Sequence, residues 1–173
     1  ALTAMGLSKL PGALLGGRMV RRRLGRMFRF RHARLRQDLL RHQPWADRVP
    51  MRVAITGSSG LIGSRLSVFL RSGGHEVIPI VRHAPEPGTR QVQWNVTGGT
   101  IDSAGLEGVD AVVHLAGENI AAGRWNDAQK QRIRDSREKG TRLLSETLAK
   151  LNDPPKTLIC ASAVGYYGDR GDE

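Results

Sequence analysis

A glycine loop at residues 57–63, which reads Gly-Ser-Ser-Gly-Leu-Ile-Gly, limits the folds that this chain can adopt. The apolar run at residues 53–55 predicts a short buried strand before the loop, and helical periodicity follows it. In a dinucleotide-binding turn of this order, Gly57 permits the tight turn and Gly60 lets the backbone approach a pyrophosphate. Gly63 lets the helix pack closely on the strand. We therefore predict a dinucleotide-binding loop here.

The other residues of the loop complete the candidate phosphate site, which thus also includes Ser58, Ser59, Leu61 and Ile62. The phosphates would lie on free amides at the helix N-terminus, where the helix dipole favours negative charge. The sequence contains no Gly-Lys-Ser or Gly-Lys-Thr tripeptide, so a nucleoside-triphosphate loop is not favoured. A turn with a purely structural role is the alternative interpretation.

Strand and helix signals alternate from the glycine loop onward. The predicted strands occupy residues 53–55, 75–81, 91–96, 110–115 and 157–163. One predicted helix follows the loop and ends at the glycine pair 73–74, and a second covers residues 126–151. This alternation predicts an α/β fold, a Rossmann-like doubly wound parallel sheet of five strands covered by helices.

The carboxyl ends of these strands should form one cleft, because ligands of such sheets bind outside the carboxyl ends. The fourth strand ends at Leu115 and breaks at Ala116 and Gly117, and small residues there let a cofactor lie against the strand end. The segments expected to converge on the cleft are residues 57–63, Arg82, residues 115–117 and residues 162–167.

The end of the second predicted strand indicates which cofactor is bound. An Asp or Glu about 20 residues beyond the glycine loop binds the ribose 2′-hydroxyl of NAD, whereas an Arg suits the 2′-phosphate of NADP. This chain has Arg82 and His83 there. We therefore predict NADP rather than NAD, and a solvated loop arginine is the alternative.

For two further residues the sequence predicts a structural role and no part in chemistry. His114 lies inside the fourth strand pattern, which is typical of a hydrogen-bonded core histidine rather than of a catalyst. Cys160 is the single cysteine, so an internal disulfide is excluded and a reducing compartment such as the cytoplasm is expected. We predict that Cys160 packs in the core.

The net charge of +11 lies almost wholly in the first fifty residues. Residues 1–50 contain eleven arginines and one lysine against Asp38 and Asp47, a net charge of +10, which leaves +1 for residues 51–173. The basicity that suggests nucleic-acid binding therefore belongs to the N-terminal segment and not to the predicted sheet.

Glycine and proline make the first stretch loop-like, and residues 19–41 predict a basic amphipathic helix. Its apolar positions near one face are Val20, Leu24, Phe28, Leu35 and Leu39. Residues 44–50 predict a linker, because two prolines bracket them. The alternatives for the helix are a transit peptide, a membrane-surface or nucleic-acid helix, and, with most support, a terminal helix docked on another domain.

Six motifs occur in order over residues 51–168, and together they are more specific than the glycine loop. They are Thr-Gly-Ser-Ser-Gly-Leu-Ile-Gly at 56–63, Val-Gln-Trp-Asn at 92–95, His-Leu-Ala-Gly-Glu-Asn-Ile at 114–120, Gly-Arg-Trp-Asn at 123–126, Ser-Arg-Glu-Lys-Gly-Thr at 136–141 and Ser-Ala-Val-Gly-Tyr-Tyr-Gly at 162–168. The combination resembles the extended, atypical branch of the short-chain dehydrogenase/reductase superfamily. Within it, the chain resembles the NAD-dependent epimerase/dehydratase-like proteins, also described as nucleoside-diphosphate-sugar epimerase-like proteins and cell-division-inhibitor homologues.

This resemblance implies a cofactor site. It implies that Arg82 contacts the 2′-phosphate side of NADP, that Leu115 and Ala116 line the cofactor, and that Arg137 offers a charge to cofactor or substrate phosphates. The spacing alone is equally compatible with Arg137 on the helix surface. Glu118 and Asn119 would either bind cofactor or substrate or structure the loop. The implied function is an NADP-binding oxidoreductase or epimerase-like protein that acts on a carbinol or ketone of a small-molecule substrate such as a nucleotide sugar.

The catalytic residues of the superfamily are only partly matched. Its members use a Tyr-x-x-x-Lys pair, in which the Tyr is the general acid/base. Tyr166 and Arg170 have this spacing but follow the fifth strand directly, where the superfamily does not place the pair. The position of the superfamily's Ser or Thr falls on Ala163, one residue after Ser162. The candidate catalytic residues are therefore Ser162 and Tyr166, and a non-catalytic NADP-binding sensor or scaffold is the alternative function.

The resemblance also suggests a longer parent protein. Residues 1–43 resemble the last helix of a START-like cyclase/dehydrase domain, and residues 51–173 would be the N-terminal part of a Rossmann domain. The expected partners are a small-molecule substrate and the missing C-terminal part of the same protein. No metal is predicted, and nucleic-acid or membrane contact by the basic helix is the weaker alternative.

Overall fold

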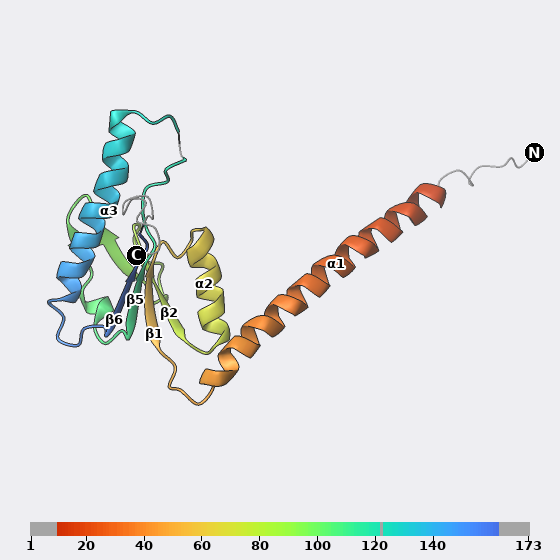
Figure 1. Cartoon of the computed structure of the whole chain (residues 1–173), viewed down its shortest axis with the longest axis horizontal. Helices are drawn as coiled ribbons and strands as arrows, with labels where there is room; N and C mark the ends of the chain where they lie inside the picture. Colours follow the sequence, from red (N-terminus) through yellow and green to blue (C-terminus); the bar gives the residue numbers. More distant parts are fainter. Residues whose placement is uncertain (1–9, 122, 163–173) are drawn as a thin grey trace, which may run out of the picture. The chain divides into compact units, whose positions relative to one another are not determined.

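The computed structural model describes residues 10–121 and 123–162, and the chain divides into two compact units, Ala1–Asp47 and Arg48–Glu173. In the first unit a single long helix, α1 (Leu10–His42), is followed by a short 3-10 turn, η1 (Gln43–Trp45) (Figure 1). The helix begins nine residues earlier than residue 19, so the prediction of a loop before that residue was wrong for residues 10–18. Pro11 lies in the first helical turn, where its missing N–H costs no hydrogen bond.

In the described part of the second unit, the strands form a six-stranded sheet in the order β4-β3-β2-β1-β5-β6. Its strands are β1 (Arg52–Thr56), β2 (Glu76–Val81), β3 (Val92–Asn95), β4 (Thr100–Ile101), β5 (Ala111–His114) and β6 (Thr157–Cys160). Ala54 of the central strand β1 lies between Ile78 of β2 and Val112 of β5, and both neighbours run parallel to it. The predicted Rossmann-like α/β fold is confirmed.

Two helices cover opposite faces of this sheet, α2 (Leu61–Ser72) and α3 (Asp127–Leu148) (Figure 1). Alternate residues of each strand point to opposite faces. Ala54 and Val112 therefore pack with Leu144 and Leu148 of α3. The residues on the other face, packed with Leu66 and Leu70 of α2, are Val53, Ile55, Val77, Ala111 and Val113. The two layers hold the strand ends in fixed positions, which is what a site at those ends requires.

The boundaries of α3 follow from local chemistry. Asn126 caps its N-terminus, because its side-chain oxygen accepts a hydrogen bond of 2.8 Å from the backbone N–H of Gln129. The helix ends at Leu148 and not at residue 151 as predicted, since the N–H groups of Lys150 and Leu151 bond to carbonyls three residues back, which tightens the chain into a turn.

Two other predictions about the sheet were wrong. The strand β4 was missed, and it pairs antiparallel with β3, so the sheet is not wholly parallel. A two-residue strand has no periodicity to detect, and its position depends on the turn that brings Thr100 opposite Asn95. Cys160 was expected in the core but is exposed, because β6 is the edge strand and all four of its residues are exposed.

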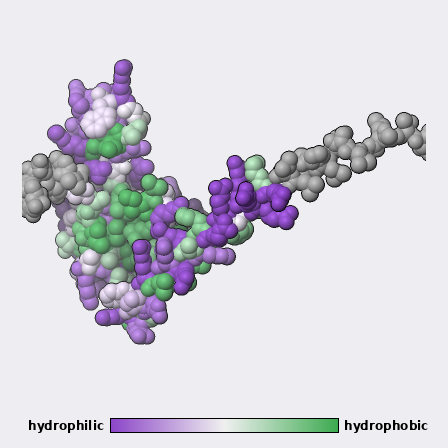
Figure 2. All heavy atoms as spheres, turned by 45° about the vertical axis from the view of Figure 1, so that its right-hand side comes forward, coloured by the Kyte–Doolittle hydropathy of each residue, from purple (hydrophilic) through white to green (hydrophobic). Residues whose placement is uncertain are grey.

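Apolar surface gathers on one face of the second unit (Figure 2). The exposed apolar residues on α2 and β6 include Leu61, Ile62, Val68, Leu158 and Ile159. On α1, the predicted apolar positions Val20, Leu24 and Phe28 are also exposed. Within the described part of the chain, no helix combines the length and the hydropathy that crossing a bilayer requires.

Candidate functional site

The glycine loop connects β1 directly to α2 at the carboxyl end of the sheet (Figure 1). Gly57 has a φ of 67°, in the left-handed region that glycine adopts without strain. The N–H of Gly60 donates to the carbonyl of Gly57 over 3.0 Å and closes the turn. Gly60 then caps α2, whose first turn contains no acidic residue and receives no side-chain cap. The first amides of α2 therefore remain available to an anion.

The close packing around this loop admits no side chain at two of its glycines. A Cβ on Gly63 would lie 2.8 Å from the Cα of Ser58, and one on Gly57 would lie 3.0 Å from the backbone nitrogen of Ala116. In both cases the neighbouring atoms belong to the backbone and cannot rotate away. The glycine loop thus rests on α2 and on the end of β5, as a dinucleotide cradle requires.

A buried threonine joins the ends of β1 and β5. The Thr56 hydroxyl accepts hydrogen bonds of 3.0 Å from the backbone N–H groups of both Leu115 and Ala116. It also lies 2.7 Å from Nδ1 of His114. Thr56 is fully buried, and the sequence reasoning gave it no role. The only sequence signal for it is its place directly before the glycine loop.

His114 is a buried, hydrogen-bonded histidine, as predicted, and it is 4% exposed. Burial, and secondly the positive charge of Arg137, lower the pKa of His114 below its ordinary value. Trp94 packs against the imidazole edge to face, with ring centroids 5.8 Å apart. Because folding favours the neutral form, the stability that His114 contributes is present above about pH 6.5 and is lost as the pH falls through its folded-state pKa.

Arg137 reaches from α3 to the loop after β5. A Cβ built on Gly117 would lie 3.1 to 3.2 Å from three atoms of the Arg137 guanidinium, so that group lies directly against Gly117. Its position next to the end of β5 also explains its effect on His114. The structure therefore brings together five of the predicted site residues, which are Gly57, Leu115, Ala116, Gly117 and Arg137.

Replacing Arg137 with alanine is expected to raise the pKa of His114 towards its ordinary value, because one of its two lowering causes is removed while burial remains. An NMR titration of the imidazole would measure this shift. Arg134→Ala removes the same charge from another exposed position of α3 and is the control. An unchanged His114 pKa in Arg137→Ala would contradict the assigned contact.

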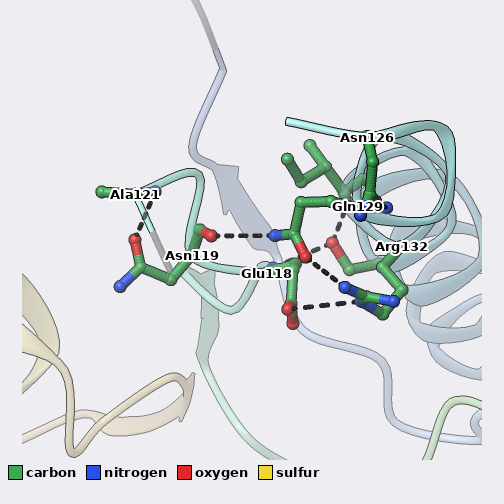
Figure 3. Close-up of polar contacts among 8 residues, drawn as sticks. Glu118, Asn119, Ala121, Asn126, Gln129 and Arg132 are labelled. Atoms are coloured by element: carbon green, nitrogen blue, oxygen red, sulfur yellow. Dashed lines mark hydrogen bonds and ion pairs between the residues drawn. The ribbon is translucent and has the colours of Figure 1, made fainter. Parts of the chain in front are cut away.

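The loop between β5 and α3 is held by polar contacts to the first turns of α3 (Figure 3). The backbone N–H of Glu118 donates to the Ser136 hydroxyl over 2.9 Å. The side-chain amide of Gln129, itself 4% exposed, donates to the carbonyl of Asn119, and Arg132 donates to the other end of the same amide. Of the two roles that were open for Glu118 and Asn119, these contacts support structuring of the loop. Gln129 and Ser136 were not recognised as loop-binding residues, since their partners lie ten or more residues away.

The other predicted site residues are more exposed. Leu61 and Ile62 are 85% and 67% exposed at the start of α2, Ser58 is half-buried, and Ser59 is exposed. Arg82 is exposed immediately after β2. Ser162 is exposed, two residues beyond β6, and Tyr166 lies outside the described residues. Among residues 10–121 and 123–162, no three His, Cys, Asp or Glu side chains group as a metal site.

Comparison with known proteins relates the second unit of the chain to epimerase family proteins. Residues 53–173 match the model of the NAD dependent epimerase/dehydratase family. The chain is 51% identical over 120 residues to the epimerase family protein Mb2239 of Mycobacterium bovis, a match that covers 69% of this chain and 39% of that protein. The chain thus spans about two fifths of the length of this curated relative.

Two solved structures are similar in fold and in sequence. The nucleoside-diphosphate sugar epimerase from Corynebacterium glutamicum matches with a TM-score of 0.65 and 43% identity, over 85% of this chain and 31% of that one. The human epimerase family protein SDR39U1, solved with NADPH, matches with a TM-score of 0.56 and 36% identity, over 68% of this chain and 38% of that one. The first match covers 85% of this chain, whereas residues 48–173 make up less than three quarters of it. The first match therefore extends into the N-terminal unit.

Proposed function

The chain belongs to the NAD dependent epimerase/dehydratase family, and on that premise we propose that it binds a nicotinamide dinucleotide at the glycine loop. The observation that carries this proposal is the cradle itself. Backbone atoms so close to Gly57 and Gly63 leave no room for side chains, while the first turn of α2 presents amides without an acidic neighbour. The pyrophosphate would lie on those amides.

Within this function, we propose that NADP is preferred to NAD. Arg82 is exposed directly after β2, the strand next to β1, where a guanidinium would pair with the 2′-phosphate of NADP. The structure of the human relative with NADPH supports the same choice. Arg137, held against Gly117, would offer its charge to a phosphate of the cofactor or substrate.

We propose that the whole protein is an oxidoreductase or epimerase-like enzyme that acts on a carbinol or ketone of a small molecule. The Corynebacterium relative, a nucleoside-diphosphate sugar epimerase, supports a substrate of nucleotide-sugar type. The bound nicotinamide would supply hydride transfer, while the protein supplies orientation and electrostatics. Ser162 and Tyr166 remain the candidates for contact with the reacting group. Further chain would cover the exposed apolar residues of α2 and β6.

For the N-terminal unit we propose that α1 is the final helix of a START-like domain. The exposed apolar side chains of α1 support this proposal, because they include Val20, Leu24 and Phe28, which another domain could bury.

Calorimetric titration of the chain with NADPH and, separately, with NADH tests the cofactor proposal. We expect saturable binding of NADPH and weaker binding of NADH, because only NADPH has a phosphate for Arg82. ATP is the control for unspecific binding of phosphates to a basic protein. Failure of a folded chain to bind either dinucleotide would contradict the proposed function of this chain.

A further inference from the structure

The Thr56 hydroxyl is a hydrogen-bonding group whose capacity is fully used. A hydroxyl has one hydrogen to donate and two lone pairs to accept with. The N–H groups of Leu115 and Ala116 occupy both lone pairs. The hydrogen of Thr56 must therefore point to Nδ1 of His114, 2.7 Å away, and Nδ1 must accept it. This assigns His114 as the neutral tautomer with its proton on Nε2.

Protonation of His114 is incompatible with this arrangement. The imidazolium has N–H groups on both nitrogens, so Nδ1 would present a hydrogen to an oxygen that already receives two. Thr56 would have to release the N–H of Leu115 or of Ala116. The N–H of Leu115 has a second acceptor in the Thr56 carbonyl at 3.3 Å, which makes it the bond that is lost at the lower cost. The lowered pKa of His114 agrees with a site built for the neutral form.

The backbone of Leu115 and Ala116, which Thr56 binds, packs against the glycine loop. A Cβ on Gly57 would be 3.0 Å from the Ala116 nitrogen and 3.1 Å from the Leu115 carbonyl carbon, so these backbones are in contact. A shift of residues 115–116 would therefore move Gly57, from which the turn into α2 begins. The backbone that would bind the cofactor thus depends on one buried hydrogen-bond network.

We infer that Thr56 and His114 are a positioning pair for the dinucleotide site, and that protonation of His114 weakens dinucleotide binding by releasing the end of β5. This inference rests on the proposed function, since it concerns the affinity of the same site. It assigns a role to two residues that need not touch the cofactor, because they act through the backbone of Gly57, Leu115 and Ala116.

The residues packed around His114 determine which control variants a pH-dependent measurement of this pair needs. Thr56 faces it from β1, Trp94 from β3 and Arg137 from α3. Cys160 is its neighbour in register on β6 and brings a thiol beside it. Cys160→Ser removes any contribution of the thiol and serves as a background variant.

The first experiment places the proton without any cofactor. Long-range ¹H–¹⁵N NMR spectra of the wild-type chain are expected to show His114 protonated on Nε2 and unprotonated on Nδ1 at pH 7.5. Thr56→Ser retains the hydroxyl and is expected to retain this tautomer, whereas Thr56→Val removes it. A neutral His114 with its proton on Nδ1 would overturn the inference.

The second experiment measures binding of NADP⁺, which withstands acid, between pH 7.5 and 4.5 in chains verified as folded by circular dichroism. His114→Asn keeps an acceptor near the position of Nδ1 but cannot be protonated. Because the phosphate of NADP⁺ also titrates near pH 6, the difference between wild type and this variant reports His114. We expect wild type to lose about threefold more affinity than His114→Asn as the pH falls, and Thr56→Val to bind about fivefold more weakly than Thr56→Ser at pH 7.5.

Each outcome separates the two proposals. Equal pH profiles for wild type and His114→Asn, with NADP⁺ bound by both, would overturn the positioning role and leave the proposed function intact. If Thr56→Val does not fold, the comparison of wild type with His114→Asn decides alone. If folded wild type does not bind NADP⁺, both the proposed function and the inferred effect of His114 protonation on affinity are wrong. The NMR spectra would still show which nitrogen of His114 carries the proton.

Discussion

Replacement of Gly63 by alanine is expected to abolish dinucleotide binding and to destabilise the second unit by about 1 to 3 kcal/mol. The added Cβ would lie 2.8 Å from the Cα of Ser58 and 2.9 Å from the carbonyl carbon of Gly57. These atoms are backbone, so α2 must move away from β1 or the loop must open. Either movement displaces the amides on which the pyrophosphate would lie. Thermal unfolding and calorimetric titration with NADPH would measure the two effects.

Two other substitutions make this result specific. Gly60→Ala places a Cβ 3.2 Å from the Gly57 carbonyl oxygen, which is a tighter contact than usual but not a clash, so a smaller loss is expected. Ser64→Ala changes the next residue of α2, whose exposed hydroxyl donates only a long bond of 3.4 Å to the carbonyl of Leu61. If Gly63→Ala unfolds at the same temperature as Ser64→Ala and binds NADPH with the same affinity, the close packing at residue 63 is needed neither for stability nor for binding.

Replacement of Arg82 by alanine is expected to weaken NADPH binding by about 1 to 3 kcal/mol and to leave NADH binding nearly unchanged. The reason is that NADPH has a 2′-phosphate and NADH does not, while Arg82 lies exposed at the end of β2. Titrating both nucleotides into wild type and variant measures the difference directly, because every contact that the nucleotides share cancels.

The matched control for this variant is Arg71→Ala. Arg71 is an exposed arginine in the last turn of α2, at the opposite end of that helix from the glycine loop. Its replacement changes the net charge by the same amount as Arg82→Ala but far from the proposed phosphate site. Both variants should be compared at the same ionic strength, since long-range attraction of a phosphate is screened by salt. If Arg82→Ala weakens the binding of NADPH and of NADH equally, Arg82 does not contact the 2′-phosphate. If Arg71→Ala weakens NADPH binding as much as Arg82→Ala does, the effect comes from the loss of net charge and not from a contact.

Much of the fold could be predicted because its signals are local. The alternation of β-branched runs with helical periodicity located β1, β2, β3, β5 and β6, and Asn126 marked the beginning of α3. The two-residue strand β4 carries no such signal, since only its pairing with β3 makes it a strand. Cys160 was misplaced for a related reason, because an apolar run does not reveal whether its strand is central or at the edge.

The candidate site divides in the same way. The glycine positions and Arg82 could be proposed from spacing, because a βα turn and the following strand end lie close together in the sequence. Thr56 and its partners at His114, Leu115 and Ala116 are 58 to 60 residues apart, and no local pattern relates them. The contact of Arg137 with Gly117 likewise depends on how α3 packs across the sheet.

The order of the elements, the glycine loop and the concentration of charge in the N-terminal unit can all be read from the sequence. These are properties of neighbouring residues, and steric preference and periodicity are sufficient to express them. Three relations become visible only in the folded chain: the hydroxyl that holds the ends of β1 and β5, the nitrogen of His114 that accepts its hydrogen, and the guanidinium that lies against Gly117. Those relations require the register of β1 against β5 and the packing of α3, which are set by the burial of the whole core.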